Sequence, residues 1–179
     1  TGHNQEALEG FQNILREYPE ASELVAVRYK IAHIYFNMGD FRNSISASME
    51  WINLYPDNPM RIDIMSLLGS NYISLGNRSE AFRWLVTAIK VNAGRQFQNL
   101  NEELKTKTIE LIKGSSREEL ERMAEYGKNS EFLPYIYHRL ALLSIDEGMA
   151  EDAMNYTMQL VRSSKDETWI SLGRDLHPC

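Results

Sequence analysis

The sequence predicts an all-α protein made of stacked helical hairpins. Three observations lead to this expectation: recurrent glycines, small residues at constant distances from them, and apolar residues spaced three and four apart. The glycines are Gly2, Gly39, Gly76, Gly114 and Gly148, which are separated by 37, 37, 38 and 34 residues. Recurrence with such a period indicates a supersecondary unit that stacks on its own copies. Hardly any stretch alternates apolar and polar residues, so no sheet is expected.

Residues at constant offsets from the glycines resemble one another. Five positions later stand Ala7, Ser44, Ala81 and Ala153, and twelve positions later stand Ile14, Trp51, Ala88 and Leu160. Eight positions earlier stand Ile31, Leu68 and Leu140, which are followed by Ala32, Gly69 and Ala141. We expect the small residues to let paired helices approach to about 8–10 Å. The unit around Gly114 is degenerate, because Lys107 stands where a small residue is expected.

The same residues predict where the helices end. We expect helices over residues 4–18, 21–38, 41–55, 60–75, 78–92, 97–113, 116–126, 133–146, 149–163 and 166–175. A glycine ends the first helix of each pair, since the left-handed conformation found there costs glycine least. Pro19 and Pro56 follow second helices, which proline cannot continue. Ser116 and Glu119 have the spacing of a capping box at the start of a helix.

This pattern resembles the tetratricopeptide repeat, a helix-turn-helix unit of about 34 residues. The resemblance is strong over 2–93, weak over 94–132 and moderate over 133–165. It implies an α-solenoid, in which the hairpins form a right-handed superhelix. Arg28 and Met65 depart from the family, which often has an aromatic residue near the start of the unit. We expect one repeat domain over 1–179, with units at roughly 1–20 (partial), 21–58, 59–93, 94–132 (degenerate) and 133–165 and a terminal helix at 166–176.

A narrower resemblance concerns residues 115–161 and the Tyr-Pro junctions after the second helices. The junctions resemble variants that are common in bacterial envelope proteins. Residues 115–161 are similar to the repeat domain of penicillin-binding-protein activator lipoproteins, where it precedes a periplasmic-binding-protein domain. This resemblance implies a bacterial cell-envelope protein in the periplasm or anchored to the outer membrane, with a cytoplasmic location as the alternative. Gly2 at a turn position and an unpaired helix at 166–175 predict a fragment of a longer chain.

Composition and motifs exclude several function classes. The net charge of -6 and the pI near 5.3 argue against a nucleic-acid partner that is bound by charge. No apolar run reaches the roughly 18 residues of a membrane-spanning helix, so this segment is not expected to insert. The four histidines and the single cysteine form no metal-binding spacing, and no nucleophile motif or phosphate-binding glycine loop occurs. We therefore expect no catalytic residues, no metal and no cofactor.

A binding surface is expected on the first helix of each pair, which lines the concave side of such a stack. The predicted binding residues there are Tyr29, His33, Phe36, Asn37, Asp63, Ser66, Ser70, Ser74, Tyr135 and His138. Aromatic and small polar side chains in a groove favour an extended or helical peptide as the ligand. The alternative is that Tyr29 and Phe36 only pack against the neighbouring helix. Family members that clamp a carboxylate use Lys and Asn where this chain has Tyr29 and His33, so a carboxylate clamp is not expected here.

The sequence thus predicts a non-catalytic interaction module whose concave groove binds a protein or peptide segment. The alternative is a rigid spacer or regulatory domain attached to a receptor for small ligands. An apolar pocket ringed by Tyr29, Phe36 and Tyr72 would favour a receptor, and a polar, featureless face would favour a spacer. Neither the identity of the partner nor the oligomeric state follows from the sequence.

Overall fold

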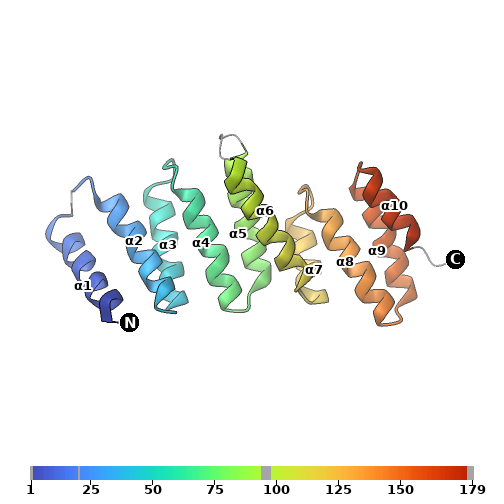
Figure 1. Ribbon diagram of the computed structural model, residues 1–179, viewed down its shortest axis with the longest axis horizontal. Helices are drawn as coiled ribbons and strands as arrows, with labels where there is room; N and C mark the ends of the chain where they lie inside the picture. Colours follow the sequence, from blue (N-terminus) through green and yellow to red (C-terminus); the bar gives the residue numbers. More distant parts are fainter. Residues whose placement is uncertain (1, 20, 94–97, 177–179) are drawn as a thin grey trace. The chain divides into compact units, whose positions relative to one another are not determined.

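A computed structural model of the chain describes residues 2–19, 21–93 and 98–176, and all regular secondary structure within these ranges is helical (Figure 1). The helices are α1 (Gly2–Glu17), α2 (Leu24–Asn37), α3 (Phe41–Leu54), α4 (Arg61–Ser74), α5 (Arg78–Asn92), α6 (Gln98–Lys113), α7 (Arg117–Tyr126), α8 (Leu133–Asp146), α9 (Ala150–Ser163) and α10 (Glu167–Asp175). The expected all-α solenoid class is confirmed, and each helix begins and ends within three residues of its expected limits.

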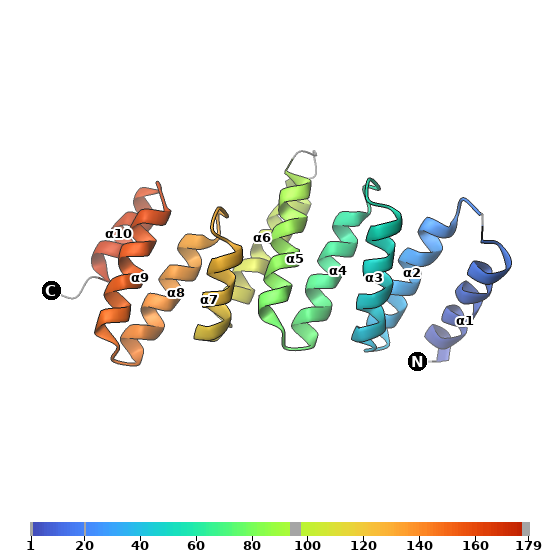
Figure 2. The same cartoon turned by 180° about the vertical axis from the view of Figure 1, so that it is seen from behind.

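The helices form two compact units, one over Thr1–Phe97 and one over Gln98–Cys179. The single repeat domain expected over 1–179 stays a prediction. In the first unit α1 packs on α2, α2 on α3, α3 on α4 and α4 on α5. In the second unit α8 packs on α9 and α9 on α10, while α6 and α7 both contact α8 (Figure 2). Neighbours in the chain are therefore mostly neighbours in space, as in stacked hairpins.

Three of the recurrent glycines end helices as expected. Gly39, Gly76 and Gly148 have φ of 78°, 76° and 72°, the left-handed region that a side chain disfavours. After α2, the amide of Gly39 donates to the carbonyl of Phe36, and the amide of the next residue donates to the carbonyl of Tyr35, at 2.9 Å each. This pair of bonds is the Schellman motif, and it recurs after α4 and α8.

The other two glycines depart from the expectation. Gly2 lies inside α1 and ends no helix, so its expected position in a turn is wrong. Gly114 follows α6 directly but is absent from the glycines with positive φ among the described residues. The helix after it starts with the expected capping box. The amide of Ser116 donates to the Glu119 carboxylate at 2.8 Å, and the amide of Glu119 donates to the Ser116 hydroxyl.

Small residues bring the two helices of a hairpin together, as their spacing predicts. Ala32 and Ser44 are buried, and the Ser44 hydroxyl donates to the Ala32 carbonyl at 2.9 Å. A Cβ added at Gly69 would lie only 2.9 Å from side-chain carbons of Leu85, so α4 and α5 are closer there than a side chain permits. The burial of Ala81 and Ala153 at the equivalent positions confirms the register in three hairpins.

The core of the first unit continues from one hairpin into the next. Trp51 of α3 is fully buried in a cluster with Ala32, Ile64 and Leu67, which lie on α2 and α4. The buried amide of Asn71 on α4 donates to the Ser44 hydroxyl at 2.9 Å and to the Leu67 carbonyl at 3.0 Å. Asn71 thus connects the hairpin α4–α5 to the hairpin α2–α3 by a polar bond inside the core.

In the second unit, hydrogen bonds of one arginine connect α7 to α8. Arg117 at the start of α7 donates to the Glu147 carboxylate at 2.7 Å and to the Ser144 hydroxyl at 3.1 Å, both on or just after α8. Lys107 of the degenerate unit is half-buried, and burial lowers the pKa of its ammonium group. Lys107 therefore stands where the other hairpins have a small residue.

Candidate functional site

Aromatic side chains gather on one face of α2. Tyr29, His33 and Phe36 are four and three residues apart, so the helix places them on the same side. The rings of Tyr29 and His33 have their centroids 4.4 Å apart at a tilt of 42°. Phe36 meets the edge of Phe41 at 5.6 Å, at the start of α3. The structure thus brings together three of the residues predicted for binding.

The same aromatic side chains also contribute to the core. Tyr29 and Phe36 pack against the cluster that contains Trp51 and Ile64, and both remain half-buried. Tyr29 and Phe36 therefore do pack against neighbouring helices, as the alternative interpretation states, but part of each side chain remains exposed. Their exposed parts are held in place by the core, so a ligand would meet rings whose rotamer entropy is already reduced.

Asp63 of α4 supplies negative charge to this surface. Burial, together with the charge of Asp63, raises the pKa of Tyr29. Burial lowers the pKa of His33, although the charge of Asp63 acts in the opposite direction. The Nε2 atom of His33 is buried and has no hydrogen-bond partner among the described residues. The α2–α4 surface, defined as Tyr29, His33, Phe36 and Asp63, thus combines fixed rings, an unsatisfied ring nitrogen and an exposed carboxylate.

The remaining predicted residues of the first unit are less distinctive. Ser66, Ser70 and Ser74 follow one another at four-residue spacing along α4, and only Ser74 is exposed. The hydroxyl of Ser70 donates to the carbonyl of Ser66 at 3.1 Å, so this hydrogen bond lies within α4. Asn37 is exposed at the end of α2.

In the second unit the two predicted residues line a cavity. Tyr135 and His138 of α8 both meet Trp169 of α10, with ring centroids at 4.6 Å and 5.6 Å in edge-to-face arrangement. The cavity has a volume of about 440 Å³ and is also lined by Ile109 and Ile112 of α6. We call it the α6–α8–α10 groove. Its volume falls within the range of about 300–1,000 Å³ that small ligands occupy in proteins.

Trp169 is the residue that sequence reasoning missed. The helix around it was expected as the first helix of a further hairpin, which places one of its faces on the side of α6 and α8. The signal available in the sequence was the tryptophan itself, because the predicted binding residues Tyr135 and His138 on the preceding first helix also carry rings. Which residues of the short helix face α8 depends on how α10 rests on α9, and the chain pattern does not encode that geometry.

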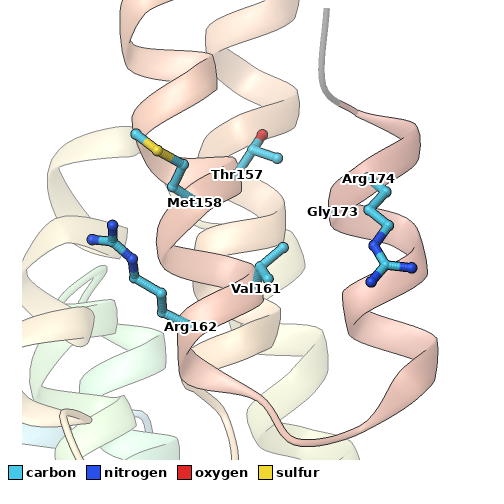
Figure 3. A pocket seen from close by; sticks show the side chains of 6 residues that line it. All are labelled: Thr157, Met158, Val161, Arg162, Gly173 and Arg174. Atoms are coloured by element: carbon cyan, nitrogen blue, oxygen red, sulfur yellow. The ribbon is translucent and has the colours of Figure 1, made fainter.

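A further cavity of about 280 Å³ lies between α9 and α10 (Figure 3). Gly173 of α10 is buried there, and a Cβ added to it would come within 2.5 Å of the Val161 side chain. Met158, Arg162 and Arg174 make up the exposed part of the lining. The close approach of the two helices explains why glycine stands at position 173.

In the part of the chain that the structure describes, no group of three or more His, Cys, Asp and Glu side chains is arranged to hold a metal ion. Nor does any helix within the described ranges combine the length and the apolar character that a membrane span requires.

Three similar solved structures are BtubC (BKLC) from P. vanneervenii, MamA, and a tetratricopeptide repeat protein from Parabacteroides merdae ATCC 43184. Their TM-scores are 0.48, 0.45 and 0.48, at identities of 17%, 16% and 16%. The matches cover 98%, 90% and 98% of this chain and 79%, 89% and 66% of the other chains. No curated protein matches the sequence.

One family matches directly. The tetratricopeptide repeat model matches residues 25–58, which span α2, α3 and the turn after them. Repeats of this family generally mediate protein–protein interactions. The matched segment also contains the aromatic residues of the α2–α4 surface. Residues 25–58 are therefore similar to a tetratricopeptide repeat, and they lie within an all-helical solenoid.

Proposed function

We propose that this chain is a non-catalytic interaction module that docks a protein or peptide segment on the α2–α4 surface. The observation that carries the proposal is the arrangement of Tyr29, His33 and Phe36, which are half-buried on one face of α2. Tyr29 and Phe36 are also packed against the core around Trp51. Rings that are partly exposed and already ordered are efficient anchors for a partner. The exposed Asp63 and the net charge of -6 favour a neutral or basic segment over an acidic one.

Replacing both Tyr29 and Phe36 by alanine should abolish capture of the partner from the native source. Truncating an anchoring aromatic often costs more than about 1 kcal/mol of binding free energy. The measurement is affinity capture with the purified wild-type and variant chains. Because both rings also pack on the core, a second variant, Asp63→Lys, changes only an exposed side chain and reverses its charge. It should weaken a neutral partner little and a basic partner strongly, while circular dichroism stays unchanged.

The control substitutions must lie on the opposite helix of the hairpin. Arg42 and Glu50 of α3 are both exposed, but Glu50 forms an ion pair with Arg28 of α2. Arg42→Ala combined with Met49→Ala avoids that ion pair, since Met49 is also exposed on α3. Loss of capture in this control pair, with capture retained in the aromatic pair, would contradict the proposal. Capture that survives every change would place the docking site on another face, and a wild-type chain that captures no partner would favour the rigid spacer.

We also propose that the protein works in a bacterial cell envelope, either in the periplasm or anchored to the outer membrane. The support is the similarity of residues 115–161 and of the Tyr-Pro junctions to bacterial envelope proteins. A regulatory domain attached to a periplasmic ligand receptor remains the alternative within the same compartment. Cell fractionation should place the full-length native protein in the envelope fraction, and a cytosolic location would refute this proposal.

A further inference from the structure

The two half-buried histidines of the predicted surfaces have opposite charges beside them. The charge near His33 in the first unit comes from Asp63, a carboxylate. The charge near His138 in the second unit comes from Arg139, and together with burial it lowers the pKa of His138. The α2–α4 surface is thus locally negative and the α6–α8–α10 groove is locally positive. A ligand suited to one is unsuited to the other.

The groove combines an apolar floor with cationic side chains. Ile109, Ile112 and Leu142 contribute aliphatic carbon, and Trp169 closes the side formed by α10. Arg139 of α8 and Lys113 of α6 belong to the same lining, which contains no acidic residue. On α8 the lining residues 135, 138, 139 and 142 follow helical spacing, so the helix presents them on a single face.

Arg139 carries a positive charge without a nearby acidic partner among the described residues of the second unit. No ion pair involves Arg139 in residues 2–19, 21–93 and 98–176, and its buried Nε has no hydrogen-bond partner there. Lys113 differs, since it pairs with the exposed Glu110 at 3.0 Å. Arg139 is half-buried, and a carboxylate that pairs with the accessible part of its guanidinium would form charge-assisted hydrogen bonds.

We propose that the α6–α8–α10 groove is a second docking surface, which takes an acidic peptide segment. An apolar side chain of the segment enters between Trp169 and the isoleucines of α6, and a neighbouring aspartate or glutamate pairs with Arg139. The whole chain carries an excess of negative charge, so the attraction acts locally and does not steer the partner from a distance. This surface does not require binding at the α2–α4 surface.

Selection from a library of random peptides tests the inference without a known partner. The peptides are displayed inside a loop, so that they offer no free terminal carboxylate, and are selected on the full chain. Peptides that also bind the Arg139→Gln variant are discarded by counter-selection. We expect the retained peptides to share an aromatic or aliphatic residue with Asp or Glu close to it.

Affinities measured by fluorescence anisotropy then separate charge from shape. Arg139→Gln should weaken a selected peptide by about tenfold, and replacing the acidic residue of the peptide by its amide should cause a similar loss. The two losses should not add, because each removes the same pair. Lys128→Gln is the matched control. It removes an exposed positive charge from the same unit and should change the affinity by no more than about twofold.

Several outcomes would overturn the inference. They are failure to enrich any peptide that depends on Arg139, enrichment of basic peptides, and self-association of the chain that Arg139→Gln abolishes. Peptides that depend on Tyr29 and Phe36 instead would leave the proposed function standing and remove only the second surface. The converse result is binding of acidic peptides in the groove while the Tyr29 and Phe36 substitutions leave partner capture unchanged. That result would refute docking at the α2–α4 surface and support docking in the α6–α8–α10 groove.

Discussion

Replacing Trp51 by alanine should lower the free energy of unfolding by about 3–5 kcal/mol, as truncating a large buried aromatic residue does. Trp51 is fully buried, and the cluster around it joins α2, α3 and α4. Its indole N–H also donates to the carbonyl of Val25 at 2.9 Å, which ties α3 to α2. Urea denaturation followed by far-ultraviolet circular dichroism measures the loss. Whole domains are stable by only about 5–15 kcal/mol, so the first unit should become marginal.

The control for this prediction is another tryptophan. Trp84 on α5 is only half-buried, and the guanidinium of Arg83 lies 5.9 Å from its ring. Trp84→Ala should therefore cost clearly less than Trp51→Ala. Trp51→Phe keeps most of the apolar area and loses the indole hydrogen bond. The free energy of unfolding that it costs should therefore lie between the costs of Trp84→Ala and Trp51→Ala. Equal losses for Trp51→Ala and Trp84→Ala would show that the core is not centred on Trp51.

Replacing Asn71 by aspartate should destabilise the chain by about 3 kcal/mol or more at neutral pH. The amide nitrogen of Asn71 donates to Ser44 and to the Leu67 carbonyl inside the core. A carboxylate has no proton to donate, and the Ser44 hydroxyl already gives its proton to the Ala32 carbonyl. The new charge would thus be buried among acceptors. Thermal or urea denaturation at pH 7 measures the loss.

The pH dependence of this variant gives a sharper test. Burial among acceptors raises the pKa of the introduced carboxyl in the folded state above its unfolded value of about 3.9. The penalty is then fully present above the folded pKa and shrinks as the pH falls toward the unfolded pKa, because the protonated acid is neutral and can donate. Asn71→Ala lacks a titrating group, so its penalty should not shrink in that way. A penalty for aspartate that stays constant down to pH 4 would contradict a buried position 71.

The sequence by itself determined where helices end and how hairpins pair. These features depend on residues close together in the chain: a glycine that accepts positive φ, a proline that stops a helix, and Ser116 with Glu119 three residues on. Small residues at fixed offsets then placed Ala32 against Ser44, because both belong to one hairpin with a short turn. Where the local signal was weak, around Gly114 and at Gly2, the expected turn geometry was not found.

The predicted binding residues show the same division. Tyr29, His33 and Phe36 share a face of one helix, and the helical period alone is enough to bring them together. That Asp63 would approach them from α4 was not predictable from the period, and neither was the pairing of Glu50 with Arg28. The contacts of those residues depend on how far one helix is shifted along its neighbour and on the angle at which they cross.

Tertiary structure alone decided which polar groups became buried partners and which aromatic side chains met. Asn71 connects two hairpins, and Trp169 joins Tyr135 and His138 around a cavity, across 34 and 31 residues of chain. Helical periodicity predicts which face of a helix is apolar. It does not predict which neighbouring helix that face contacts, or at which position along that helix. The energies that choose among those arrangements come from close packing and from satisfying buried polar groups, and they exist only once the helices are assembled.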